Sequence, residues 1–196
     1  MSATRLLVLG VVRMYGKAHG YQVRRELLTW SADKWANIQP GSVYHALKKM
    51  TAEKLLEQVE VEPGESGPDR TAYRVTEAGE TEFHVLLSHA LSSGRHTTGA
   101  EMGAAITLMT TLPRKQVIGL LRHRVFQLET DVRSASLLAG QSDSWGQPAH
   151  IRELFRSWEM HAETSLSWLR QLIERLEAGE YVMADDPGRS FGQPPQ

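Results

Sequence analysis

Apolar residues that recur at intervals of four and three positions predict three short helices at the start of the chain. The first, over residues 3–15, is apolar enough to be buried, and Gly16 ends it. The second covers residues 21–30, and the third opens at the stretch Gln39-Pro40-Gly41-Ser42. The third helix has an apolar face of Val43, Leu47 and Met50, an opposite polar face of Ser42, His45 and Lys49, and flanks formed by Tyr44 and Lys48.

Strict alternation of apolar and polar residues then predicts a two-stranded hairpin. Val59 and Val61 alternate with polar residues, a turn signal runs over residues 63–68, and Thr71, Tyr73 and Val75 alternate in their turn. Three short helices followed by a hairpin is the order of a winged helix-turn-helix, whose third helix enters the major groove of DNA. The polar face of the third helix fits that use, because hydroxyl, imidazole and ammonium groups can reach phosphates or base edges.

The second half of the chain is predicted to be helical. A helix begins at Thr76 and ends near residue 91, and a polar linker covers residues 92–99. A short apolar segment over residues 102–112 precedes two long amphipathic helices, which extend from about residue 114 to 139 and from about 149 to 178.

These elements predict a mainly α fold with a small β-hairpin, in two domains. A winged helix-turn-helix domain with a linking helix is expected over residues 1–92, and a helical dimerisation and effector domain over residues 100–180. Residues 184–196 lack apolar periodicity, so we expect a disordered tail.

The broad apolar stripes of the two long helices predict a homodimer, since a small winged-helix domain leaves little core to cover them. With two-fold pairing, the third helix of each subunit would meet one of two half-sites, about 34–36 Å apart on one face of DNA. The residues expected in the dimer interface are Val117, Leu121, Leu128, Phe155, Leu169 and Ile173.

The last long helix also suggests a pocket for a flat apolar ligand, between the winged helix and the dimer helices. Trp158 lies on the main apolar stripe, while Trp168 lies on its edge with His161. We expect Trp158 in the core and Trp168 beside the cavity, and name Trp158, His161 and Trp168 as the effector-binding candidates.

Composition and charge are those of a soluble protein. The chain has 196 residues, 41% hydrophobic and 23% charged, and no cysteine. Residues 1–76 carry 11 Lys and Arg against 8 Asp and Glu, a net charge of +3, which leaves −4 for the remainder. A basic half can serve a polyanion. The longest apolar run, residues 6–12, is too short to span a membrane, so a cytoplasmic location without membrane contact is expected.

Five short motifs in order resemble the signature of the PadR family of bacterial transcriptional regulators. They are Leu9-Gly10, His19-Gly20-Tyr21, the stretch from Gln39 to Leu47, Glu53-Lys54-Leu55-Leu56, and the stretch from Tyr73 to Gly79. The resemblance implies a DNA-binding homodimer, usually a repressor, that an aromatic or hydrophobic small molecule releases from an inverted-repeat operator. It also implies that Pro40 begins the recognition helix, with Ser42 and Tyr44 on phosphates. The DNA-binding candidates are Gln39, Ser42, Tyr44, His45, Lys48, Lys49 and Arg70.

The hairpin departs from the family pattern, in which a basic wing is common. Only Arg70 stands at the tip, beside Asp69, and the hairpin also holds Glu57, Glu60, Glu62 and Glu65. Phosphate repels such a wing, which lowers the expected affinity for DNA.

An enzyme and a winged helix that binds protein or RNA are the two other classes of function. An enzyme is not expected, because the chain has no Gly-x-Ser-x-Gly, His-Glu-x-x-His or Gly-rich phosphate motif. The eight His residues include no helical pair with the four-residue spacing of a shared metal site, and no cofactor is expected. A winged helix that contacts protein or RNA, without duplex DNA binding, stays open as the alternative.

Overall fold

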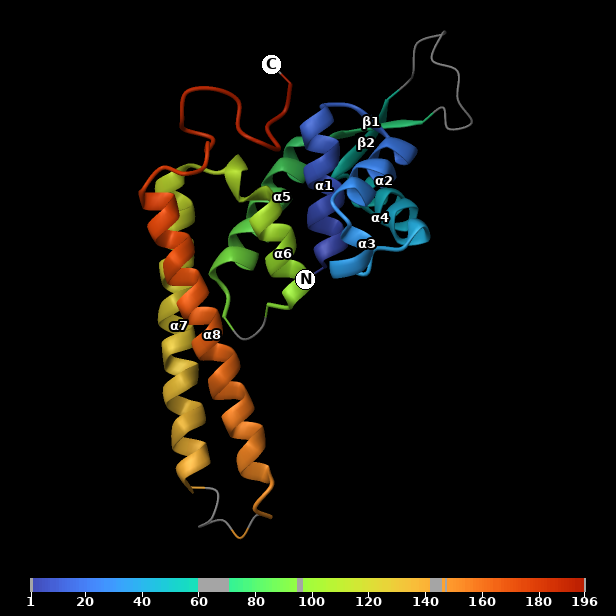
Figure 1. Ribbon diagram of the computed structural model, residues 1–196. Helices are drawn as coiled ribbons and strands as arrows, with labels where there is room; N and C mark the ends of the chain where they lie inside the picture. The colour runs from blue at the N-terminus through green and yellow to red at the C-terminus, as the bar shows by residue number, and fades with distance from the viewer. Residues whose placement is uncertain (1, 60–70, 95–96, 142–145, 147, 196) are drawn as a thin grey trace. The chain divides into compact units, whose positions relative to one another are not determined.

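A computed structural model describes residues 2–59, 71–94, 97–141, 146 and 148–195 of the chain (Figure 1). The chain divides into two compact units. Unit 1 comprises Met1–Ala90, Thr98–Pro113 and Val182–Gln196, and unit 2 comprises Leu91–Thr97 and Arg114–Tyr181. The bounds of these units differ from those of the two predicted domains. Residues 98–113 and the segment after residue 181 belong with the first unit.

Unit 1 contains short helices and a small sheet. Its helices are α1 (Ala3–Tyr15), α2 (Gly20–Thr29), α3 (Ala32–Trp35), α4 (Pro40–Ala52), α5 (Glu77–Ser92, whose last two residues belong to unit 2), α6 (Gly99–Leu108) and the 3₁₀ helix η1 (Met109–Thr111). Its strands are β1 (Ala18–His19), β2 (Leu56–Val59) and β3 (Ala72–Val75). The predicted mainly α fold with a winged helix-turn-helix is confirmed.

The sheet has three antiparallel strands in the order β1-β3-β2, one more than the predicted hairpin. Strands β2 and β3 pair with Leu56 opposite Val75 and Val59 opposite Ala72, as expected for the stem of the wing. Sequence reasoning missed β1 because a two-residue strand has no alternation to detect. The predicted turn over residues 63–68, together with Val61 and Arg70, lies outside the described residues.

The core of unit 1 surrounds α1, which contacts α2, α4, α6 and β3. This explains why seven successive apolar or small residues of α1, Leu6 to Val12, are all buried. A Cβ at Gly10 would lie 2.6 Å from Cδ1 of Leu108, so glycine at this position allows α6 to pack closely. Residues 102–112, which the sequence assigns to the second domain, thus complete the core of the first.

The junction between wing and α5 requires Thr76 and Gly79. The Thr76 hydroxyl donates a 2.7 Å hydrogen bond to the Lys54 carbonyl and accepts one of 3.1 Å from the Gly79 amide. A Cβ at Gly79 would lie 2.1 Å from the Leu55 carbonyl oxygen, so no other residue fits without a shift of the backbone. The predicted N-cap at Thr76 is therefore also the link between α5 and the turn after α4.

Arg5 joins three elements of unit 1. Its Nη2 lies 2.5 Å from Oε2 of Glu53, which follows α4, and its Nε lies 3.0 Å from Oε1 of Glu82 on α5. Burial lowers the pKa of Arg5, but hydrogen bonds and attraction from the two carboxylates outweigh burial and raise that pKa overall. The hydrogen bond from Arg5 in turn lowers the pKa of Glu53.

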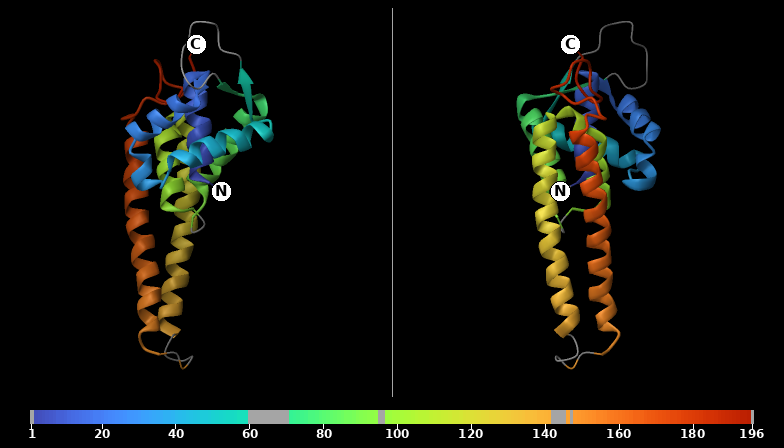
Figure 2. Two further views of the ribbon diagram at one scale, coloured as in Figure 1. Left: turned by 90° about the vertical axis from the view of Figure 1, so that its right-hand side faces the viewer. Right: turned by 60° about the vertical axis from the view of Figure 1, so that its left-hand side comes forward.

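Unit 2 consists mainly of α7 (Arg114–Gln141) and α8 (Ile151–Glu177), which pack side by side along their length as an antiparallel pair (Figure 2). Arg114 of α7 donates hydrogen bonds of 2.6 and 2.7 Å to the carbonyls of Leu176 and Tyr181, which satisfies backbone acceptors at the end of α8. The helices bury their stripes within one chain, including all six residues predicted for the dimer interface: Val117, Leu121, Leu128, Phe155, Leu169 and Ile173. The argument that these stripes require a partner is therefore wrong.

The segment after α8 is packed, in contrast to the predicted disordered tail. Met183 is fully buried and Ser190 is 2% exposed. The Ala184 amide donates a hydrogen bond to the Leu112 carbonyl, and the Thr110 hydroxyl donates one to the Phe191 carbonyl. Such a segment has no apolar periodicity because it has no regular backbone, so its few anchor residues give no recognisable sequence signal.

Because its pKa is lowered in the folded protein, Glu53 should stabilise unit 1 at neutral pH and lose this contribution as the pH falls through its folded pKa. Urea unfolding at pH 7, 5, 4 and 3.5 should therefore show a smaller acid-induced fall of the midpoint in Glu53→Gln than in the unaltered chain. Glu163→Gln, an exposed substitution on α8, should keep the full acid sensitivity. Equal pH dependence in Glu53→Gln and the unaltered chain would contradict this role of Arg5 and Glu53.

Candidate nucleic-acid interface and ligand groove

Helix α4 has two opposed faces, as its spacing predicts. Val43, Leu47 and Met50 are at most 1% exposed and fasten the helix to the core. Tyr44 is 42% exposed. The other side chains predicted to meet DNA are exposed at Gln39, His45, Lys48 and Lys49 and half-buried at Ser42.

The start of α4 is open to a ligand. Gln39 precedes the helix, Pro40 occupies its first turn, and the Ser42 hydroxyl donates a 2.6 Å hydrogen bond to the Gln39 carbonyl. A Cβ at Gly41 would meet no atom within 4 Å, so the space beside this residue of the first turn is open. The N–H groups and dipole of a helix start attract anions, and phosphate oxygens are the anions that DNA presents.

Arg24 of α2 is a cation near this helix start that sequence reasoning missed. It lines a hollow of about 240 Å³ together with Gln39 and Pro40. Asp33 lines the same hollow, so its charge is mixed. No signal in the sequence could have assigned Arg24, because only the packing of α2 against α4 brings it to the start of the helix.

The stem of the wing and its junction with α2 have mainly structural contacts. Glu57 of β2 and Arg74 of β3 form an exposed ion pair of 3.5 Å, so each partly neutralises the other. The His19 ring lies 3.2 Å from the Thr71 carbonyl through Nδ1 and stacks on Tyr21. The His19-Gly20-Tyr21 motif thus joins the sheet to α2. Arg70 lies outside the described residues.

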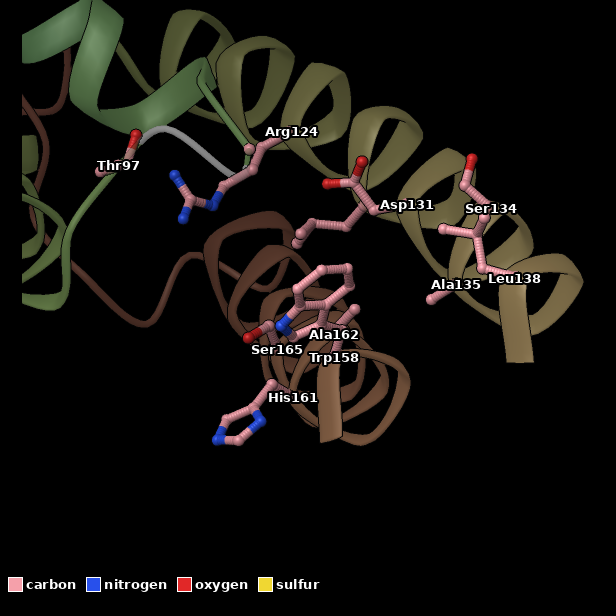
Figure 3. Close-up of a pocket in the computed structure, with 12 residues that line it drawn as sticks. Thr97, Arg124, Asp131, Ser134, Ala135, Leu138, Trp158, His161, Ala162 and Ser165 are labelled. Carbon is pink, nitrogen blue, oxygen red and sulfur yellow. The ribbon is translucent and has the colours of Figure 1, made fainter. Parts of the chain in front are cut away.

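Unit 2 contains a groove of about 620 Å³, with walls formed by α7 and α8 (Figure 3). Leu128, Ala135, Leu138 and Ala162 give it an apolar lining. The Trp158 ring projects from α8 towards α7 and is 46% exposed, with its edge against Phe155 at a centroid distance of 5.5 Å. An apolar groove with an aromatic wall suits a flat organic molecule.

One end of the groove is polar. Arg124 is 8% exposed, burial lowers its pKa, and its Nη1 donates a hydrogen bond to the Ser93 carbonyl. Gln127 accepts a 2.6 Å hydrogen bond from the next amide, that of Gly94. These two contacts, which we call the 93–94 clamp, hold the residues that follow α5. Asp131 also lines the groove.

The structure reverses the roles predicted for the two tryptophans. Trp158, expected in the core, lines the groove, whereas Trp168, expected beside the cavity, does not line it and is 43% exposed. His161 lines the groove edge, with its Nδ1 2.5 Å from the Ser157 carbonyl. The sequence places these residues on one broad stripe of α8, but only the position of α7 determines which of them meets a cavity.

Comparison with known families gives a match that lies within unit 1. Residues 8–85 match the model of the transcriptional regulator PadR-like family. We call this matched part of the chain the PadR-like domain. The matched range covers most of α1, the helix-turn-helix, the sheet and the first half of α5. The resemblance predicted from the five motifs is thereby confirmed.

Solved structures that resemble the chain include Bacillus subtilis PadR in complex with operator DNA. It is 17% identical, with 88% of this chain and 98% of that chain covered and a TM-score of 0.40. The PadR-like transcriptional regulator of Bacillus cereus is 14% identical, with 90% and 99% covered and a TM-score of 0.38. Bacillus subtilis PadR in complex with p-coumaric acid is 16% identical, with 89% and 99% covered and a TM-score of 0.36. The family assignment rests on the match over residues 8–85.

A comparison with curated protein sequences gives no significant match. Within the described residues, no three His, Cys, Asp or Glu side chains gather as metal ligands. No helix in the described part of the chain is both long and apolar enough to cross a membrane.

Proposed function

We propose that this protein is a cytoplasmic, homodimeric transcriptional repressor that binds an inverted-repeat operator and is released by a small aromatic or hydrophobic ligand. The PadR-like domain is the observation that carries this proposal. It supplies a helix α4 whose apolar face is fixed in the core and whose polar face is open.

The DNA contacts follow from the exposed face of α4. Tyr44 and Ser42, near the helix start, are placed to hold phosphates, where the helix dipole adds to their hydrogen bonds. In this proposal His45, Lys48 and Lys49 contact DNA further along its major groove, while Gln39 and Arg24 flank the helix start. Arg70 completes the set predicted from sequence. Phosphate contacts give affinity and base-edge contacts give specificity, so this surface can provide both.

The dimer surface is assigned to one flank of α8, in place of the buried stripes. Leu154 and Trp168 are 45% and 43% exposed, and their spacing of fourteen residues, close to four helical turns, puts both on that flank. Large exposed aromatic side chains are typical of interface anchors. A second copy related by two-fold symmetry would cover them.

The ligand is assigned to the groove of unit 2, with Trp158 as its aromatic wall and His161 at its edge. A molecule that enters beside Arg124 and Gln127 would disturb the 93–94 clamp. Because α5 begins directly after the wing and ends at this clamp, the helix offers a continuous connection from ligand to DNA-binding elements. A ligand with different affinity for the two states of the clamp would thus change the affinity for DNA.

Lys49→Ala should weaken duplex binding and reduce the slope of log affinity against log salt by about one counterion per subunit, because it removes a cation from phosphate. Duplexes selected from a random pool by the unaltered chain provide the probe for band-shift titrations at several salt concentrations. Lys115→Ala, an exposed lysine on α7, should leave affinity and slope unchanged.

An unchanged slope in Lys49→Ala would contradict the placement of this lysine on phosphate. If the unaltered chain binds no duplex with steep salt dependence, the alternative function gains support, in which the winged helix contacts protein or RNA.

Trp168→Asp should convert a dimer into a monomer in sedimentation equilibrium at micromolar concentration, because a charge replaces an apolar anchor in the interface. Phe126→Asp makes the same change at a side chain of α7 that is 64% exposed and outside the proposed flank, so that variant should remain dimeric. A monomeric unaltered chain, or a dimer that loses its association only in Phe126→Asp, would contradict the assigned surface.

A ligand of the groove should change tryptophan emission and weaken duplex binding together. Titration with p-coumaric acid and with 8-anilinonaphthalene-1-sulfonate provides a first test. Trp158→Phe should weaken ligand binding and remove most of the emission change, because Trp158 forms the groove wall, whereas Trp168→Phe should keep the affinity for the ligand. A response that survives in Trp158→Phe and disappears in Trp168→Phe would place the ligand elsewhere.

A further inference from the structure

The segment of residues 182–196 belongs to the DNA-binding unit, although it follows the last helix of unit 2 in the sequence. Met183 anchors its start, and Ser190 and Gly192 are buried further along. The Gln193 side chain donates a 3.3 Å hydrogen bond back to the Ala184 carbonyl. The segment is therefore a closed loop with its own internal contact, held against unit 1.

Two backbone carbonyls of this segment are held by side chains of the PadR-like domain and of η1. The Phe191 carbonyl accepts a 2.9 Å hydrogen bond from Thr110. The Gly192 carbonyl accepts one of 3.2 Å from Nη1 of Arg13. Arg13 also donates to Glu80 of α5 at 2.8 Å, and its guanidinium lies 5.2 Å from the Phe83 ring centroid. The same arginine thus fixes α1, α5 and the segment.

The side chain of Phe191 reaches the end of α2. Its ring lies 5.5 Å from the ring of Trp30, which directly follows that helix. Trp30 is itself held by a 3.1 Å hydrogen bond to Glu26, which also accepts one of 2.8 Å from Tyr15 of α1. The Trp30 carbonyl accepts a hydrogen bond from the indole of Trp35 at the end of α3.

These contacts reach the linker that leads to the recognition helix. The Trp35 ring packs against α6, where a Cβ at Gly103 would lie 2.8 Å from that ring. Residues 30–39 then lead into α4, which also packs on α2. The orientation of α4 therefore depends on where α2 and Trp30 are held.

We propose that residues 182–196 position the helix-turn-helix for DNA binding, through Phe191 on Trp30 and Gly192 on Arg13 and Thr111. This inference rests on the proposed DNA-binding function. The segment supplies no cation to phosphate in this role. Its loss should leave the DNA contacts of α4 in place but reduce the fraction of molecules in which α4 is correctly oriented.

Gly192 offers a direct test because a side chain at this position would clash with Thr111. Its φ is +81°, and a Cβ there would lie 2.8 Å from Cγ2 of Thr111. Gly188, in the same segment, has a φ of +102°, but a Cβ there would meet nothing within 4 Å. Gly192→Ala and Gly188→Ala therefore share the backbone strain of a positive φ, and only the first pushes the segment away from η1.

The experiment uses the full chain and the selected duplex, at a temperature where circular dichroism shows every variant to be folded. Gly192→Ala and Phe191→Ala should each weaken duplex binding roughly threefold to tenfold, with the salt slope unchanged, because the competent fraction falls while the phosphate contacts remain. Gly188→Ala and Phe191→Tyr should bind as the unaltered chain does, the latter because it keeps a ring against Trp30. If Gly192→Ala does not fold, the pair Phe191→Ala and Phe191→Tyr decides the question.

Hydrogen exchange provides a readout that does not depend on DNA. Amides of α2 and α4 should exchange faster in Gly192→Ala and Phe191→Ala than in Gly188→Ala, since the end of α2 is less firmly held. Unchanged affinity and exchange in the first two variants would overturn the proposal, as would an equal loss in Gly188→Ala or a shallower salt slope. If the unaltered chain binds no duplex, the proposed function fails, and the exchange comparison still decides whether the segment positions the helix-turn-helix.

Discussion

The all-round burial of α1 is the constraint on which unit 1 depends. Over Leu6 to Val12 this helix is apolar on every side, so it must be covered on every side there, and no single neighbour can do this. In this protein α2, α4, α6 and β3 share the task. Helix α4 therefore also forms one side of the core, and three of its side chains are buried there. Its opposite face is polar for the complementary reason, since water or a polyanion must meet it.

The same constraint explains why unit 1 is not continuous in sequence. The winged helix by itself leaves part of α1 uncovered, and α6 with η1 fills that place, as the close approach of Leu108 to Gly10 indicates. The segment after residue 181 then packs on η1 and on the ends of α1 and α2. Residues far outside the PadR-like domain thereby contact the helices of that domain.

In unit 2, the packing of α7 on α8 is incomplete. The long stripes of α7 and α8 satisfy each other, which leaves a groove where small residues such as Ala135 and Ala162 fail to fill the space between the helices. Arg124 is buried at one end of this groove. Because a guanidinium removed from water loses its hydration, nearby hydrogen-bond acceptors must replace it. Its bond to the Ser93 carbonyl ties the groove to the end of α5.

The sequence by itself determined α1, α2, α4, α5, α7 and α8, the wing stem, the two faces of α4 and the resemblance to the PadR family, whereas α3 and η1 were not predicted. The elements depend on local periodicity and on caps such as Thr76, whose hydroxyl accepts a hydrogen bond from an amide only three residues later, and the family resemblance depends on short motifs. The tertiary structure alone decided the rest: that β1 joins the sheet, that α6 and residues 182–196 complete unit 1, that Arg24 stands at the start of α4, and that Trp158 rather than Trp168 faces the groove. The physical reason is common to all four. Each depends on which surfaces meet across the chain, and the spacing of residues within one element carries no information about its partner.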